Sequence, residues 1–237
     1  GQKGNFLDVP TDCPQRDERL GWTGDAQVFV KTASYNFDVE RFFIKWLADL
    51  RADQTPWGTI PHVIPNVFGT EDDCSAAWAD AATICPWQIY QTYANKQILE
   101  DSLDSMKDYI EFIETRADNG LWSRSWHFGD WLNLDGSSAE DCSKGTEKSL
   151  IATAFYIYSS AIYAKSLELC GKDASAIWAK RENSINAFRR EYMKDGRTLP
   201  EYATQTACVL PLHFGITDNA AETAKQLNEL VTECGHL

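Results

Sequence analysis

The stretch that decides the fold is GTEKSLIATAFYIYSSAIYAKSLELC, residues 145–170, which is long enough for a helix and apolar nearly all round. Its longest uncharged run, residues 149–164, contains three serines and spans 16 residues, which is short for a membrane span and typical of a buried helix. The following segment, residues 172–195, has one charged face. A helix that is apolar all round lies in the interior, whereas an amphipathic helix lies at the surface. The two segments therefore predict a hairpin of one buried and one half-buried helix.

The same alternation runs through the rest of the chain, where apolar residues recur three and four positions apart. Three more nearly all-apolar segments are each followed by a segment with one charged face: 24–37 by 38–53, 76–95 by 96–118, and 202–214 by 217–234. Little of the sequence reads as strand. We predict an all-α fold of helical hairpins in two concentric layers, an inner ring wrapped by an outer one. A stacked-hairpin superhelix is the competing arrangement, but no fixed-period repeat is visible.

Composition excludes several classes of protein. The chain has 237 residues, 43% of them hydrophobic and 24% charged, which is typical of a globular protein with a real core. Its net charge of −13, without a cluster of lysines or arginines, argues against a nucleic-acid partner, and the apolar segments argue against a membrane partner. Seven cysteines, scattered and without a CxxC pair, indicate buried thiols rather than a disulfide framework or a zinc site. We therefore expect no metal and no cofactor, and the cysteines favour a cytoplasmic location.

Two long connections are rich in aromatic residues: QTPWGTIPHVIPNVFGTEDDCS (54–75) and NGLWSRSWHFGDWLNLDGSSAEDCS (119–143). Loops of this length inside a compact domain are commonly functional. Each would join one hairpin to the next, so we expect both to lie on one rim of the ring, beside residues 12–25.

The stretch TDCPQRDERLGWTGDAQ, residues 11–27, contains four carboxylates, two arginines and a tryptophan. Pro14 and Gly21 disfavour a continuous helix, so we expect an ordered loop that leads into a helix beginning near Thr23. Asp25 would then lie in the first helical turn, where the helix dipole favours its ionised form. On composition alone, a structural network of ion pairs is the favoured explanation of these charges.

The longer run DVPTDCPQRDERLGWTGDAQ, residues 8–27, resembles the signature of the inverting α-L-rhamnosidases of the six-hairpin kind, whose catalytic domain is an (α/α)6 barrel. AAWADA (76–81), FGDWL (128–132) and TQTACVLPLHFGI (204–216) fit the same family, so the resemblance spans nearly the whole chain. It implies an enzyme that releases terminal rhamnose from a rhamnose-containing glycoside or polysaccharide.

The resemblance also implies site residues. The general acid falls on Glu18, the residues that hydrogen-bond the rhamnose hydroxyls on Asp12, Arg16 and Asp25, and the aromatic residues of the sugar pocket on Trp22, Trp78 and Trp131. Core packing is the alternative role for each tryptophan. His127 has no motif to support a pocket role and is interpreted as a loop or supporting residue.

Inverting glycosidases need one protonated carboxyl group and a second, ionised one that activates water. Asp12 and Asp25 would raise the pKa of Glu18 by like-charge repulsion, while Arg16 and Arg19 would oppose that shift.

The family's general base is a glutamate that follows the eighth helix in a WERW-like context, with a pocket histidine after it, and neither has an equivalent before the final TECGHL. The chain also lacks an initiator Met. We therefore expect residues 1–237 to be a partial (α/α)6 catalytic barrel of about four hairpins, without the last hairpins and the flanking β-sandwich domains. In the alternative, Glu71, Asp73 or Asp130 is the base and the domain is complete.

Two other functions remain open from the sequence: another six-hairpin carbohydrate enzyme of the glucosidase or phosphorylase kind, and a non-catalytic carbohydrate-binding protein. The sequence does not specify the aglycone, the linkage, the source organism or the oligomeric state.

Overall fold

The computed structural model describes residues 1–13, 18–69, 74–133 and 145–235. Within these ranges the long helices are α2 (Thr23–Asn36), α3 (Glu40–Asp53), α4 (Ala81–Tyr93), α5 (Gln97–Arg116), α6 (Lys148–Leu169), α7 (Ser175–Tyr192), α8 (Gln205–His213) and α9 (Ala220–Cys234). They match the eight predicted segments in order. A short helix, α1 (Gln2–Asn5), and a 3-10 turn, η1 (Pro200–Tyr202), were not expected.

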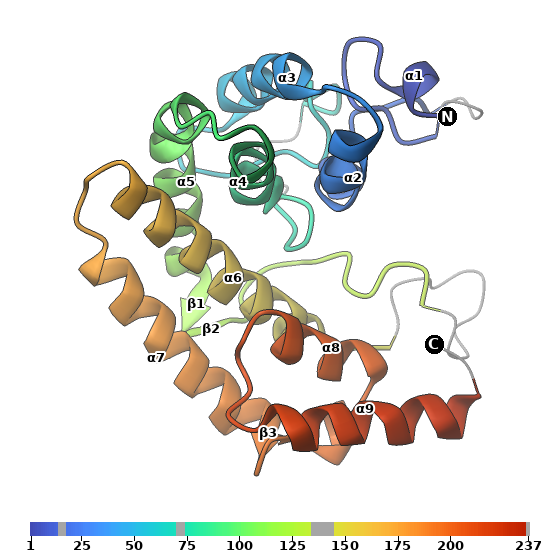
Figure 1. Ribbon diagram of the computed structural model, residues 1–237. Helices are drawn as coiled ribbons and strands as arrows, with labels where there is room; N and C mark the ends of the chain where they lie inside the picture. Colours follow the sequence, from blue (N-terminus) through green and yellow to red (C-terminus); the bar gives the residue numbers. More distant parts are fainter. Residues whose placement is uncertain (14–17, 70–73, 134–144, 236–237) are drawn as a thin grey trace.

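The eight helices form an arc of four hairpins in two layers (Figure 1). Helices α2, α4, α6 and α8 follow one another along the inner side and pack in that order, while α3, α5, α7 and α9 lie outside them. The predicted all-α, two-layered hairpin fold is confirmed. The alternation of apolar and amphipathic segments predicted the layering because each inner helix must be covered on more than one side.

Two small antiparallel strand pairs end the outer helices α5 and α7. Strands β1 (Ala117–Asp118) and β2 (Leu121–Trp122) form one pair, and β3 (Met193–Lys194) and β4 (Arg197–Thr198) form the other. Their turns are Asn119-Gly120 and Asp195-Gly196, and all four residues have positive φ. Asn-Gly and Asp-Gly are the strongest short-range signals for a hairpin turn, so the predicted helices 96–118 and 172–195 end too late.

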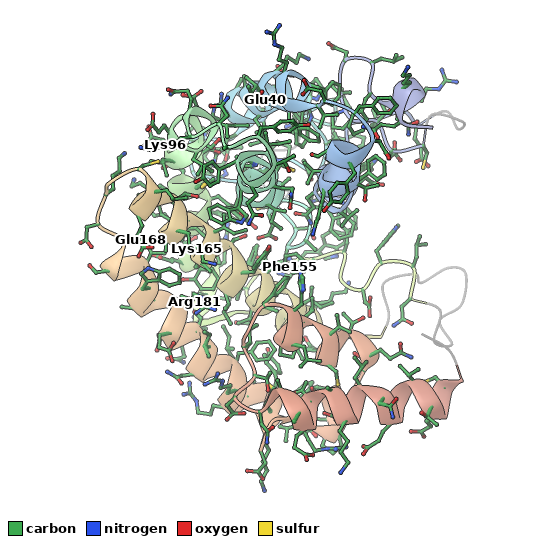
Figure 2. The ribbon with its side chains drawn as sticks, viewed as in Figure 1. Glu40, Lys96, Phe155, Lys165, Glu168 and Arg181 are labelled. Carbon is green, nitrogen blue, oxygen red and sulfur yellow. The ribbon has the colours of Figure 1, made fainter. Side chains whose placement is uncertain are left out.

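The core lies between the two layers. One cluster joins the first three hairpins and includes the fully buried Phe43, Trp46 and Met106. A second lies among α6, α7 and α8 and includes Phe188. Phe155 of α6 points toward α8 (Figure 2), where its ring centroid lies 5.2 Å from that of Phe214. Helix α6 is buried on nearly all sides, as its composition predicts.

Helix α2 differs from the expectation of burial all round. Ala26, Val30 and Ala33 are buried, but Val28 and Tyr35 are 77% and 78% exposed. As the first inner helix of the arc, α2 has its main helix contact with α4, and no described helix packs on its other side to the same extent. One face of α2 therefore exposes apolar side chains to solvent.

The prediction of buried thiols is correct for only some of the described cysteines, since Cys13 and Cys170 are partly buried and Cys234 is exposed. Cys13, Cys74, Cys85, Cys170, Cys208 and Cys234 form no disulfide, and Cys74, Cys85 and Cys208 are buried. In the part of the chain that the structure describes, no helix has both the length and the apolar character needed to span a membrane.

Candidate functional site

The charged stretch forms a loop that is tied to the first long connection. The amide of Thr23 donates to the carbonyl of His62 at 2.9 Å, and the amide of Ile64 donates to the carbonyl of Gly21 at 2.8 Å. A Cβ atom at Gly21 would collide with the Ile64 carbonyl, so this close backbone approach requires glycine. Helix α2 begins at Thr23, as predicted. The loop therefore enters α2 along the inner rim of the arc.

The loop also closes on itself next to α2. The amide of Asp12 donates to the carbonyl of Leu20 at 3.1 Å, and the amide of Leu20 donates to Oδ1 of Asp12 at 3.2 Å. Arg16, predicted to bind rhamnose, lies outside the described residues. The two hydrogen bonds to Leu20 fix Asp12 at the start of the loop. Glu18, farther along the same loop, is exposed.

Asp12 and Glu18 lie close together. With Cys13 they form a group whose potential ligand atoms are all within 4.8 Å of one another. Burial acts to raise the pKa of Asp12, but hydrogen bonds from Cys13, Glu18 and the Leu20 amide together hold it below its ordinary value. Partly exposed acidic groups of this kind are common without an ion, and we assign no metal to this one.

Asp25 lies in the first turn of α2, as expected, but its pKa moves in the opposite direction to the one the helix dipole favours. Desolvation by the surrounding protein raises the pKa of Asp25, although the residue remains solvent-accessible, and the charges of Asp12 and Glu18 raise it further. A backbone hydrogen bond from the Asp25 amide acts to lower the pKa, as expected at the start of a helix, but desolvation outweighs it. Desolvation is the largest cause of the raised pKa, and repulsion among the three nearby carboxyl groups adds to it.

A pocket of about 330 Å³ lies beside these carboxylates. Asp12 and Asp25 line it together with residues of the N-terminal segment and of α2, among them Asn5, Thr11 and Phe29. A second hollow, of about 600 Å³, lies between the β3–β4 pair and α9 and includes none of the predicted site residues.

The aromatic residues of the rim gather around Phe128. Its ring centroid lies 4.6 Å from that of Trp78, 4.7 Å from those of His62 and Trp126, 5.5 Å from that of Trp131 and 6.1 Å from that of Trp22. These rings come from the charged stretch, from both long connections and from the turn before α4. The prediction that these segments share one rim is confirmed for the described residues.

The three predicted pocket tryptophans are not core residues. Trp131 is 48% exposed and Trp22 and Trp78 are half-buried, whereas Trp46 and Trp122 are fully buried. Each of the three indoles therefore keeps some solvent-exposed surface. Phe128, which joins them, was not singled out from the sequence, although it begins the FGDWL motif.

Trp78 also contacts the start of α2. A Cβ atom at Gly24 would lie 2.8 Å from the Trp78 indole, so the ring packs against the helix backbone one residue before Asp25. The predicted helix 76–95 in fact starts at Ala81, because residues 75–80 form turns in which Ala77 has a φ of 66°. This turn places Trp78 at the rim instead of on the helix.

His127 supports the rim, as interpreted from the sequence. It is buried, its Nδ1 accepts a hydrogen bond from the amide of Ala76 at 3.1 Å, and its ring packs edge-on against Trp122. Burial lowers the pKa of His127 to about 4, and the charges of Lys148 and His62 act in the same direction. Because Nδ1 accepts, the ring proton of the neutral form lies on Nε2.

Asp130, one of the three alternative bases, anchors the rim to the fourth hairpin. Its Oδ2 accepts from Oγ1 of Thr146 at 2.8 Å, and that hydroxyl also shares a hydrogen bond of 2.6 Å with Thr204, the N-cap of α8. The other two alternatives, Glu71 and Asp73, lie outside the described residues.

Comparison with known proteins agrees with this geometry. Residues 1–236 match the family model of the bacterial alpha-L-rhamnosidase 6 hairpin glycosidase domain. An alpha-L-rhamnosidase of Formosa agariphila is 38% identical over 240 residues, which cover 98% of this chain and 25% of that protein.

Two solved structures have the same fold. The crystal structure of Streptomyces avermitilis alpha-L-rhamnosidase complexed with L-rhamnose superposes with a TM-score of 0.87 at 35% identity, over 99% of this chain and 22% of that one. Native alpha-L-rhamnosidase from Aspergillus terreus gives a TM-score of 0.91 at 33% identity, over 98% and 28% of the two chains. The chain thus spans about a quarter of the length of these relatives. From its sequence and its fold, the chain belongs to the bacterial α-L-rhamnosidase six-hairpin glycosidase family.

Proposed function

We propose that the protein carrying this chain is a glycoside hydrolase that releases terminal α-L-rhamnose, and that this chain supplies the acid side of its site. The observation that carries the proposal is the cluster of Asp12, Glu18 and Asp25 beside the aromatic rim, in a chain that belongs to the rhamnosidase family. The related Streptomyces avermitilis enzyme was crystallised with L-rhamnose, which supports rhamnose as the sugar.

Glu18 is the proton donor in this proposal. Glu18 lies beside Asp12, with the potential ligand atoms of the two side chains within 4.8 Å of each other. Glu18 is also exposed at the end of the loop, where the oxygen of a leaving group can approach it. A protonated carboxyl group at this point is what general acid catalysis of glycoside cleavage needs.

The remaining residues bind the sugar. Asp12, Asp25 and Arg16 would hydrogen-bond the rhamnose hydroxyls, and Trp22, Trp78 and Trp131 would contact its apolar faces. Tryptophan suits this role because it offers a large rigid surface with one polar group. The half-buried or exposed position of all three rings supports the assignment.

The general base in this proposal lies outside the chain, in the closing part of the barrel. The described residues form four hairpins where the family model names six. An inverting site keeps its two carboxyl groups roughly 6.5–9.5 Å apart to admit a water. Asp130 is a poor candidate because one of its oxygens is engaged by Thr146. Residues 1–237 alone should therefore hydrolyse rhamnosides very poorly.

The test is hydrolysis of an aryl α-L-rhamnoside by the protein that carries this chain. Glu18→Gln should lower turnover at least about 100-fold on a substrate with a poor leaving group. Glu100→Gln, on the outer helix α5, is the matched control and should leave turnover unchanged. NMR of the first-formed sugar anomer tests inversion.

Three results would contradict parts of this proposal. Near-normal turnover by Glu18→Gln would remove the proton-donor assignment. Hydrolysis or phosphorolysis of α-glucosides in place of rhamnosides would favour another six-hairpin enzyme. Robust turnover by residues 1–237, abolished by Asp130→Asn or Glu71→Gln, would place the base inside this chain.

A further inference from the structure

Asp80 is a fully buried carboxyl group outside the cluster of site carboxylates. It is 0% exposed, its Oδ1 accepts from Oγ of Ser159 at 2.5 Å, and its Oδ2 accepts from the amide of Ala77 at 2.7 Å. Thr83 extends the network through a 2.8 Å hydrogen bond with Ser159, and the Tyr109 hydroxyl is a further partner of Asp80. Burying a carboxyl group costs free energy unless its hydrogen bonds offset the loss of water, so its partners indicate its role.

The partner with a special conformation is Ala77. Its φ of 66° lies in the left-handed region, which residues with a Cβ atom rarely adopt unless surrounding contacts enforce it. Both of its backbone polar groups are held: Asp80 accepts from the amide, and the side-chain amide of Gln27 on α2 donates to the carbonyl. Gln27 is itself buried. The turn is thus held from α2 on one side and from the start of α4 on the other.

Trp78 directly follows this held residue. Its indole packs on the backbone of Gly24 and against Phe128, with ring centroids 4.6 Å apart. A change of φ at Ala77 would swing the indole away from both contacts, because the direction of a side chain follows the backbone that carries it. The position of Trp78 therefore depends on the two groups that hold Ala77.

We propose that Asp80 and Gln27 are positioning residues, which hold the Ala77–Trp78 turn and thereby set the Trp78 indole at the rim of the site. The role of Trp78 toward the sugar rests on the proposed rhamnosidase function, but its position does not. The competing explanation is that Asp80 serves only the stability of the α4–α6 contact through Ser159 and Thr83.

Four variants separate the two explanations. Gln27→Leu and Asp80→Ala each remove one hold on Ala77. Asp80→Asn keeps an oxygen that can accept from the Ala77 amide and should behave as the wild type. Thr83→Val removes a hydroxyl from the same buried network without touching Ala77, and is the matched control.

The first measurement, fluorine NMR, does not depend on enzymatic activity. The protein carrying this chain is labelled with fluorotryptophan, and the Trp78 resonance is assigned by its loss in Trp78→Phe. Fluorine NMR should show this resonance shifted or broadened in Gln27→Leu and Asp80→Ala, and unchanged in Asp80→Asn and Thr83→Val. An unchanged Trp78 resonance in Gln27→Leu would overturn the proposal. If Asp80→Ala does not fold, the Gln27→Leu result alone decides between the two explanations.

The second readout is the hydrolysis of an aryl α-L-rhamnoside. Gln27→Leu should raise KM about tenfold while kcat changes less than about threefold, since a lost sugar contact acts mainly on binding. Adding Trp78→Phe to Gln27→Leu should raise KM no further, because both changes act on one ring. Fully additive effects would contradict action through Trp78. If the wild type lacks rhamnosidase activity, the proposed function fails while the NMR result still decides the positioning role.

Discussion

The backbone amide of Ala76 donates a hydrogen bond to Nδ1 of His127, 3.1 Å away and 51 positions later in the sequence. Next to it, the amide of Phe128 donates to Oγ of Ser75 at 3.0 Å. These two bonds join the turn before α4 to the connection that follows β2. The aromatic rim is therefore assembled by polar contacts between loops, with Phe128 at its centre.

The first prediction concerns the pH dependence of stability through His127. Its pKa is about 4 in the folded protein and about 6.5 when unfolded, so between these values the unfolded chain binds more protons. The His127 contribution to the free energy of unfolding is therefore complete above pH 6.5 and is lost as pH falls toward 4. The loss should reach about 3 kcal/mol. Urea unfolding of wild type and His127→Gln between pH 4 and pH 6.5 measures how the difference in their free energies of unfolding depends on pH.

Asp80 changes the pH dependence of the free energy of unfolding in the opposite direction, but it does not affect the comparison of wild type with His127→Gln. Burial raises its pKa to about 6 from 3.8, so its contribution falls as pH rises through that interval. This contribution is common to wild type and His127→Gln and cancels in their difference. A flat difference for His127→Gln would contradict the assignment.

The second prediction concerns Phe128. Phe128→Ala should lower the free energy of unfolding by about 2–4 kcal/mol, because a large side chain is lost from the centre of five ring contacts. Phe128→Leu should recover only part of this, since it restores apolar volume but not ring geometry. Phe68→Ala is the control: its ring is 51% exposed and contacts Trp22 at 6.0 Å. Equal losses for Phe128→Ala and Phe68→Ala would show that Phe128 has no central role.

The third prediction concerns the contact between Gly24 and Trp78. Gly24→Ala should destabilise the protein by about 1–3 kcal/mol despite the better helix propensity of alanine, because the new methyl group overlaps the indole. Gly4→Ala, where nothing lies within 4 Å of the added atom, should change stability by less than about 0.5 kcal/mol. Thermal unfolding measures both. A smaller ring should relieve the overlap, so in a Trp78→Leu background Gly24→Ala should cost less; an undiminished cost would place the clash elsewhere.

The fourth prediction concerns the link from Asp130 to α8. Thr146→Val keeps the shape of a buried side chain but removes the hydroxyl that bonds both Asp130 and Thr204, so stability should fall by about 1–3 kcal/mol. Thr92→Val, at an exposed threonine whose hydroxyl donates within its own helix, should change stability by less than about 0.5 kcal/mol. Urea unfolding that gave the same midpoint for both variants would argue against this anchor.

The sequence by itself determined the layers and the order of the helices. The apolar run of residues 149–164 required burial on all sides, and the charged face of residues 172–195 required solvent on one side, so their layers could be assigned without coordinates. The start of α2 at Thr23 and the place of Asp25 in its first turn followed from local chain chemistry. These properties depend on neighbours within a few positions, which a sequence displays directly.

Only the tertiary structure decided how the site is assembled. Phe128 gathers rings from four separate segments, and Asp80 holds Ala77 while bonding Ser159, 79 positions away. The pKa of Asp25 rises because protein displaces water around it and because Asp12 and Glu18 lie near it, which the helix dipole alone did not predict. The exposed face of α2 likewise depends on which helix packs beside it. Each of these depends on distances between residues far apart in the chain, and local periodicity and propensity carry no information about such distances.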